Sequence, residues 1–167
     1  VQLEKSPKIA VYTPGGKQPW DDAVTMVLEY AEIPYDKIYD SAIISGASPQ
    51  YDWLHLHHED FTGQYGKFYA AFRSYPWYKK QVSDLESSAR KLGFNKVSEL
   101  KLAVAKNIKN FVVGGGFLFT MSSGTDSFDI ALSAEGVDIC EPMFDGDISE
   151  SNYQNKIDYN KTFAFTN

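Results

Sequence analysis

The stretch that decides the fold class is an apolar run between two glycine-containing turns: Gly114-Gly115-Gly116-Phe117-Leu118-Phe119-Thr120-Met121-Ser122-Ser123-Gly124. Residues 117–121 are expected to form a strand, because short apolar runs bounded by turn residues are typical of buried strands. The preceding segment, 97–113, places apolar residues at helical spacing and predicts an amphipathic helix. A second helix is expected over 126–134, so the strand lies between two helices.

The same alternation of short apolar strands and helices extends toward both ends of the chain. Further helices are expected from Pro19 to the residues before Pro34 and over 77–92, with a loop over 41–50. The remaining strands are predicted at 8–12, 35–39, 53–57 and 137–140. This pattern indicates a parallel sheet covered by helices on both faces. We therefore expect an α/β fold: a flavodoxin-like three-layer α/β/α sandwich with strand order 2-1-3-4-5.

Composition limits the classes of partner. The 167 residues are expected to form one domain, 1–167, and a formal net charge of −6 argues against a nucleic-acid partner. No apolar stretch approaches the roughly 20 residues that span a bilayer. The single Cys140 excludes an internal disulfide framework and a multi-thiolate zinc site, and we expect an inert, buried thiol.

Both ends of the chain suggest a piece of a longer protein. It begins at Val1 without a methionine and ends in 161–167, which resembles the start of a strand. We expect the remaining domains of that longer polypeptide to be partners of this one. A cytoplasmic and a periplasmic location are both compatible with these residues.

All three histidines lie within six residues that follow the start of the third predicted strand. Any imidazole base working at neutral pH must therefore come from this segment. His55 sits inside the strand and is expected to be a hydrogen-bonded core residue. His57 and His58 end the strand and point to opposite faces if it continues. No His-x₃-His or Cys-x₂-Cys spacing is present, so neither a metal site nor a cofactor site is assigned.

Ser122 lies where the fourth predicted strand turns into a helix, as the nucleophile of a strand–turn–helix elbow does. Gly124 matches the elbow pattern, but Thr120 stands where its first glycine is expected. The alternative is a serine-rich turn before a helix capped by Thr125 or Asp126. Because ligands bind beyond the carboxyl ends of parallel strands, neighbouring third and fourth strands would bring the histidines and this turn into one crevice.

The whole chain resembles a class I glutamine amidotransferase-like domain, near the ThuA-like branch. Two runs, 52–64 and 119–129, further resemble Bacteroidota proteins that carry the label asparagine synthetase B. The resemblance implies a flavodoxin-like fold. Amidotransferases of this class use an elbow cysteine followed later in the chain by histidine and glutamate. Here Met121 and Ser122 occupy the elbow and no histidine follows, so the glutaminase triad is incomplete.

Three functions follow from these observations. The first is a domain that binds a small polar ligand at the crevice, with these ligand-binding residues: His57, His58, Glu59, Ser122, Ser123 and Asp126. The second is a hydrolase or acyl-transfer enzyme in which Ser122 attacks, His57 or His58 is the base, and Glu59 or Asp60 orients the imidazole. The third is an interaction module of a cell-envelope protein.

Overall fold

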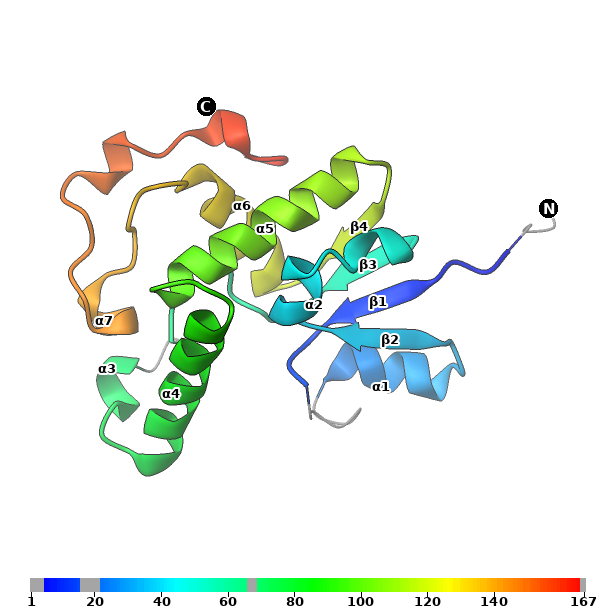
Figure 1. Cartoon of the computed structure of the whole chain (residues 1–167), viewed down its shortest axis with the longest axis horizontal. Helices are drawn as coiled ribbons and strands as arrows, with labels where there is room; N and C mark the ends of the chain where they lie inside the picture. The colour runs from blue at the N-terminus through cyan, green and yellow to red at the C-terminus, as the bar shows by residue number, and fades with distance from the viewer. Residues whose placement is uncertain (1–4, 16–21, 66–68, 166–167) are drawn as a thin grey trace. The chain divides into compact units, whose positions relative to one another are not determined.

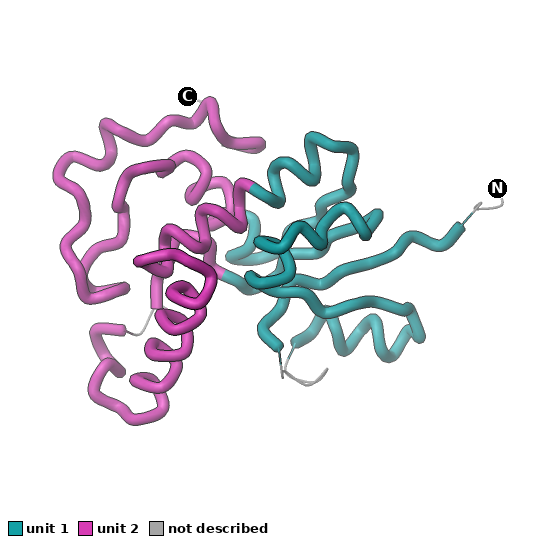
Figure 2. The backbone as a smooth tube through the Cα atoms, viewed as in Figure 1, with its two compact units in different colours: residues 1–59, 107–125 teal, residues 60–106, 126–167 magenta. Residues whose placement is uncertain are grey.

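The structure is a computed structural model that describes residues 5–15, 22–65 and 69–165 (Figure 1). The chain divides into two compact units, coloured separately in Figure 2. The first comprises residues 1–59 and 107–125, and the second comprises residues 60–106 and 126–167. Two long helices, α5 (Val97–Val113) and α6 (Ser123–Ser133), contribute residues to both units.

The first unit is built on a four-stranded parallel sheet. Its strands are β1 (Ile9–Tyr12), β2 (Tyr35–Ile38), β3 (Trp53–Leu56) and β4 (Phe117–Thr120). All of them run in the same direction, in the order β2-β1-β3-β4. The predicted fold class is confirmed: the chain has an α/β fold with a parallel sheet flanked by helices, consistent with a flavodoxin-like three-layer sandwich.

The register of the sheet aligns the strand ends. Ile9 is opposite both Tyr35 and Trp53, and Trp53 is opposite Phe117, so the four strands begin at one edge and end at the other. The central strand β1 is buried along its whole length, as expected for a strand with neighbours on both sides. Polar residues that follow the strands therefore gather at a single edge of the sheet.

Helices of the first unit are fixed by buried carboxylates. Helix α1 (Ala23–Tyr30) begins after Asp22, whose Oδ1 accepts hydrogen bonds from Val24 N at 2.9 Å and Thr25 N at 3.2 Å. The expected start at Pro19 lies outside the described residues. Helix α2 (Asp40–Ile44) begins at a buried Asp40 that accepts a hydrogen bond from Tyr12 in β1. The loop expected over 41–50 is therefore wrong, since a 3₁₀ turn, η2 (Ser48–Gln50), follows α2.

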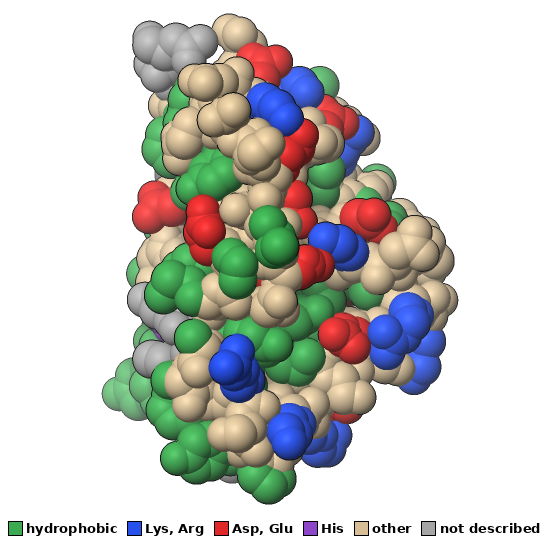
Figure 3. Space-filling view, turned by 90° about the vertical axis from the view of Figure 1, so that its left-hand side faces the viewer, with side chains coloured by type: hydrophobic (Ala, Val, Ile, Leu, Met, Phe, Trp, Pro, Cys, Tyr) green, Lys and Arg blue, Asp and Glu red, His purple; other side chains and the backbone are tan. Residues whose placement is uncertain are grey.

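The second unit is mainly helical. Its own helices are α3 (Tyr69–Phe72), α4 (Pro76–Lys91) and α7 (Pro142–Asp145), with 3₁₀ turns η3 (Tyr153–Asn155) and η4 (Tyr159–Lys161). Phe61 and Phe128 meet edge to face at 5.8 Å in its core. On the face shown in Figure 3, positively and negatively charged side chains are intermixed, so no field of one sign develops there.

Two further expectations are corrected. The strand predicted at 137–140 does not form, because Asp138 Oδ1 accepts a hydrogen bond from Cys140 N at 3.1 Å, a local bond that competes with strand pairing. Helix α6 begins at Ser123, so Thr125 and Asp126 lie inside it and do not cap it. No helix in the described ranges has both the length and the apolar character needed to cross a bilayer.

Candidate functional site

The carboxyl ends of β3 and β4 are joined by backbone hydrogen bonds. Met121 N donates to Leu56 O at 3.0 Å, and Gly124 N donates to His57 O at 2.9 Å. The residues that follow the two strands are therefore direct neighbours. The strand-end juxtaposition that the sequence predicts for the histidines and the serine turn is present in the first unit, at the level of the backbone.

Ser122 adopts a backbone conformation that residues with side chains seldom take. Its φ of +52° lies in the left-handed region, and its side chain is exposed. The following Ser123 Oγ donates a hydrogen bond to His58 O at 3.0 Å. Such strain at a strand-to-helix turn is typical of functional sites, where it fixes the direction of a side chain.

Gly124 is required by the same turn. A Cβ atom at this position would lie 2.7 Å from His57 O, closer than real Cβ contacts permit. The glycine therefore allows the turn to approach the end of β3. This approach explains the glycine that the sequence places two residues after Ser122.

The three histidines occupy different environments. His55 and His57 are buried and His58 is exposed, but β3 ends at Leu56, so the alternation expected for His57 and His58 does not apply. The rings of His57 and His58 lie close, with centroids 3.4 Å apart, so the two side chains do not point to opposite faces. Burial lowers the pKa of His55, and the nearby His57 lowers it further, so the His55 imidazole is neutral at neutral pH.

Asp22 is the site residue that sequence reasoning missed. Its Oδ1 lies 3.6 Å from Nδ1 of His57, and both side chains are buried. The signal was present in the sequence, because an aspartate before an amphipathic helix is a typical N-cap and helix starts that follow parallel strands lie at the strand-end edge. This places a carboxylate beside the imidazole of His57.

The acidic residues first considered as partners of the histidines have other contacts. Glu59 accepts a hydrogen bond from Tyr39 Oη at 3.2 Å, and burial together with this carboxylate raises the pKa of Tyr39. Asp60 belongs to the second unit, where it accepts bonds from Thr62 N at 2.8 Å and Gln64 Nε2 at 3.3 Å.

Asp126 also belongs to the second unit and is exposed in the first turn of α6. Asp22 of the first unit therefore lies within ion-pair distance of a site histidine.

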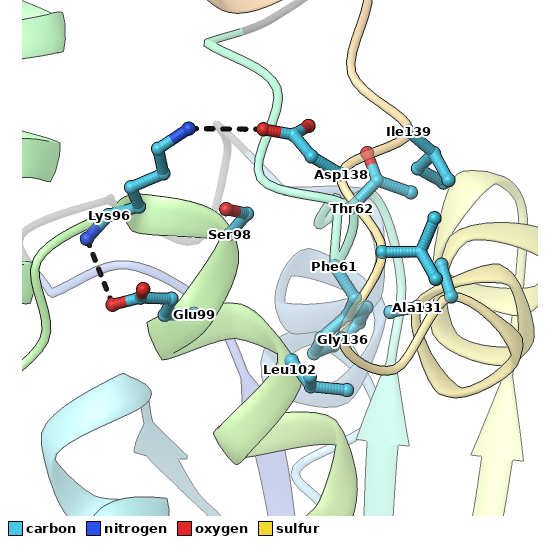
Figure 4. A pocket seen from close by; sticks show the side chains of 12 residues that line it. Phe61, Thr62, Lys96, Ser98, Glu99, Leu102, Ala131, Gly136, Asp138 and Ile139 are labelled. Carbon is cyan, nitrogen blue, oxygen red and sulfur yellow. Dashed lines mark hydrogen bonds and ion pairs between the residues drawn. The ribbon is translucent and has the colours of Figure 1, made fainter. Parts of the chain in front are cut away.

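A cavity of about 310 Å³ lies within the second unit and is drawn in Figure 4. The charged groups on its wall are already paired. Lys96 Nζ contacts Asp138 Oδ2 at 3.0 Å and Asp147 Oδ2 at 2.8 Å. Glu99 Oε2 accepts bonds from the backbone N–H groups of Asn95 at 2.9 Å and Lys96 at 3.3 Å. These contacts stabilise the start of α5, and they leave no charged group aimed at a ligand.

One cluster in the described ranges has the composition of a metal site. Single ligand atoms of Asp138, Cys140 and Asp145 lie within 4.8 Å of one another. The ammonium group of Lys96 already supplies a cation to Asp138. Burial raises the pKa of Cys140 to about 12, so its thiol stays protonated, as expected from the sequence. Cys140 Sγ donates a hydrogen bond to Thr62 O at 3.4 Å, and we assign no metal to the cluster.

Comparisons of the chain with protein-family models, with curated proteins and with solved structures found no match. The evidence for the fold class is therefore the structure itself, and the function is inferred from the residues of the site.

Proposed function

We propose that the first unit binds a small polar ligand at the carboxyl ends of β3 and β4, through His57, His58 and Ser122. The observation that carries this proposal is the hydrogen bond from Ser123 Oγ to His58 O, which holds the exposed serine turn against the histidine pair. Beyond the carboxyl ends of parallel strands is the usual place for ligands in α/β folds.

The chemistry of the turn favours a ligand with acceptor oxygens. Ser122 and His58 are exposed and offer a hydroxyl and an imidazole at the same edge. Amides and carboxylates match these groups. The resemblance to amidotransferase-like domains leads to the same class of ligand and forms part of this proposal.

The proposal is tested by thermal unfolding with glutamine, asparagine, glutamate, aspartate and short dicarboxylates at millimolar concentration. A ligand present at about 100 times its Kd raises the melting temperature by roughly 5–10 °C for a protein of this size. We expect Ser122→Ala and His58→Gln to reduce this rise. Ser83→Ala, which changes an exposed residue of α4, is the control. A panel that never shifts the transition would contradict the proposal.

A second function, acyl transfer or hydrolysis, is supported by the contact between Asp22 and His57. In this mechanism Ser122 Oγ attacks a carbonyl carbon while an imidazole takes its proton and later gives it to the leaving group. Water then attacks the acyl-serine, and the ester bond breaks to release the acid and free Ser122. Asp22 takes the orienting role first considered for Glu59 or Asp60, because it faces Nδ1 of His57.

A fluorophosphonate probe separates the two functions. An activated serine attacks phosphorus and displaces fluoride, so the protein gains a covalent adduct visible by mass spectrometry. The enzyme mechanism predicts an adduct on Ser122 that is lost in Ser122→Ala and retained in Ser83→Ala. A protein that binds the polar ligand but forms no adduct is a binding domain without this chemistry.

A further inference from the structure

One face of the sheet carries an open groove, which we call the α1–β4 groove. Its volume is about 630 Å³, within the range of small-molecule sites. Its walls come from β1, α1, β3 and β4, and its lining is almost wholly apolar apart from the side chains of β3. The central lining residues are Trp53, His55, Phe117 and Phe119. The groove lies on the face of the sheet and reaches His57 and Met121 at the strand ends, whereas Ser122 and Ser123 are not among its lining residues.

Two nitrogen atoms of the groove residues are buried without a hydrogen-bond partner in the described part of the chain. They are Nε1 of Trp53 and Nε2 of His55. The side chain of His55 is only 5% exposed. An indole N–H is always a donor, and a buried donor without an acceptor is costly. Such atoms are rare in folded proteins and indicate a missing partner.

Flat aromatic surfaces surround these two nitrogens. The ring of His55 stacks on Phe119 with centroids 5.3 Å apart, and the ring of Trp53 meets Phe117 edge to face at 5.7 Å. Phe117 is 56% exposed and Phe119 is 44% exposed, so both offer ring surface to an occupant. A planar ring packs favourably against such surfaces.

We propose that the α1–β4 groove binds a planar aromatic molecule that carries an acceptor oxygen, which takes hydrogen bonds from Trp53 Nε1 and His55 Nε2. The rings of the ligand cover Phe117 and Phe119. The acceptor oxygen satisfies the buried nitrogens, and this requirement separates the ligand from a purely apolar one. The groove shares His57 with the polar site proposed at Ser122, whereas Trp53 and His55 are not part of that polar site.

The area of the exposed face argues against a second copy of the chain as occupant. The half-exposed side chains of the groove are Val27, Phe117, Phe119 and Met121. Each leaves on the order of 100 Å² to bury, so the four together offer about 400 Å², about half of the roughly 800 Å² per partner in a stable dimer. A small ring compound needs no more surface than the groove offers.

Two fluorescent probes with the same ring system test the proposal. 1-Anilinonaphthalene-8-sulfonate carries acceptor oxygens, and N-phenyl-1-naphthylamine is the same molecule without the sulfonate. We expect Trp53→Phe and His55→Phe to weaken sulfonate-probe binding by about tenfold each, since each removes one hydrogen-bonding nitrogen. Binding of the neutral probe should change by less than about twofold, because the aromatic surface is retained.

Matched controls make the result specific. Trp77→Phe removes an exposed indole of the second unit, and Ser83→Ala changes an exposed residue of α4; neither should alter the binding of either probe. The two groove variants remove different nitrogens. If one of them loses its cooperative unfolding transition, the other still tests the proposal. Equal losses for both probes, or a dimer in sedimentation equilibrium that the probes dissociate, would overturn the proposal. Failure of the polar-ligand screen leaves this result untouched.

Discussion

Nδ1 of His57 lies 3.6 Å from Oδ1 of Asp22, and the same carboxylate group caps the first turn of α1. One buried side chain thus links the start of a helix to the end of β3. This relationship fixes which carboxylate accompanies the histidine pair. The two roles of Asp22, as cap of α1 and as neighbour of His57, can be separated by substitution, because asparagine can keep the first without the charge of the second.

Substitution of Asp22 separates the helix cap from the contact with His57. Asp22→Asn should keep the free energy of unfolding within about 0.5 kcal/mol, since asparagine caps helices as well as aspartate does. Asp22→Ala should lower it by about 1–2 kcal/mol. Both variants should shift the ring proton of His57 away from Nδ1, measured by ¹⁵N NMR of the imidazole. An unchanged His57 tautomer in Asp22→Ala would show that the carboxylate does not orient the ring.

Ser122→Gly is expected to stabilise the protein. Glycine adopts a positive φ without the steric penalty that a side chain meets, so the free energy of unfolding should rise by about 0.5–1 kcal/mol. Ser123→Gly should instead lower it, because it removes the hydrogen bond to His58 and weakens the start of α6. Chemical denaturation of both variants checks this. A loss of stability in Ser122→Gly would mean that its side chain has an unrecognised structural role.

Gly124→Ala tests the close approach of the turn to β3. The added methyl group would lie 2.7 Å from His57 O. The backbone must shift to avoid this contact, which should lower the free energy of unfolding by about 1–3 kcal/mol. Gly15→Ala is the control, since nothing lies within 4 Å of a Cβ atom there. Urea denaturation of the two variants compares them directly. Similar midpoints would contradict the geometry of the strand ends.

The lowered pKa of His55 predicts a loss of stability in mild acid. Below about pH 6.5 His55 is protonated in the unfolded chain. In the folded protein it stays neutral to a lower pH, because burial and His57 disfavour the imidazolium. The free energy of unfolding is therefore unaffected by this histidine above its unfolded pKa, and it falls as the pH drops toward the folded pKa. His55→Phe should flatten this dependence between pH 7 and 5.5, and His58→Gln is the control. Identical pH profiles for wild type and His55→Phe would contradict the prediction.

Long periodic segments were predicted well because local sequence determines them. The helix expected over 97–113 is α5 to the residue, and the strands at 8–12, 53–57 and 117–121 each differ by one residue at one end. The apolar runs identify these strands, and helical spacing identifies the helix. The strand-end juxtaposition followed from their order and direction.

Features that depend on single side chains were missed. Helix α2 has five residues, too few for a periodic pattern, and it is held by a bond between Asp40 and Tyr12 from another part of the chain. The strand predicted at 137–140 fails because Asp138 captures a backbone N–H group. Asp22 was not assigned to the site, since only the fold brings it beside His57.

The most direct test of the strand-end site is an amide NMR titration with the polar compound that gives the largest thermal shift. The account predicts saturable changes, fitting one Kd, at these backbone amides: His57, His58, Ser122 and Ser123. The amide signals of the residues that line the second-unit cavity around Lys96 should not shift. Largest changes around Lys96, or no saturable change at the ends of β3 and β4, would contradict the account.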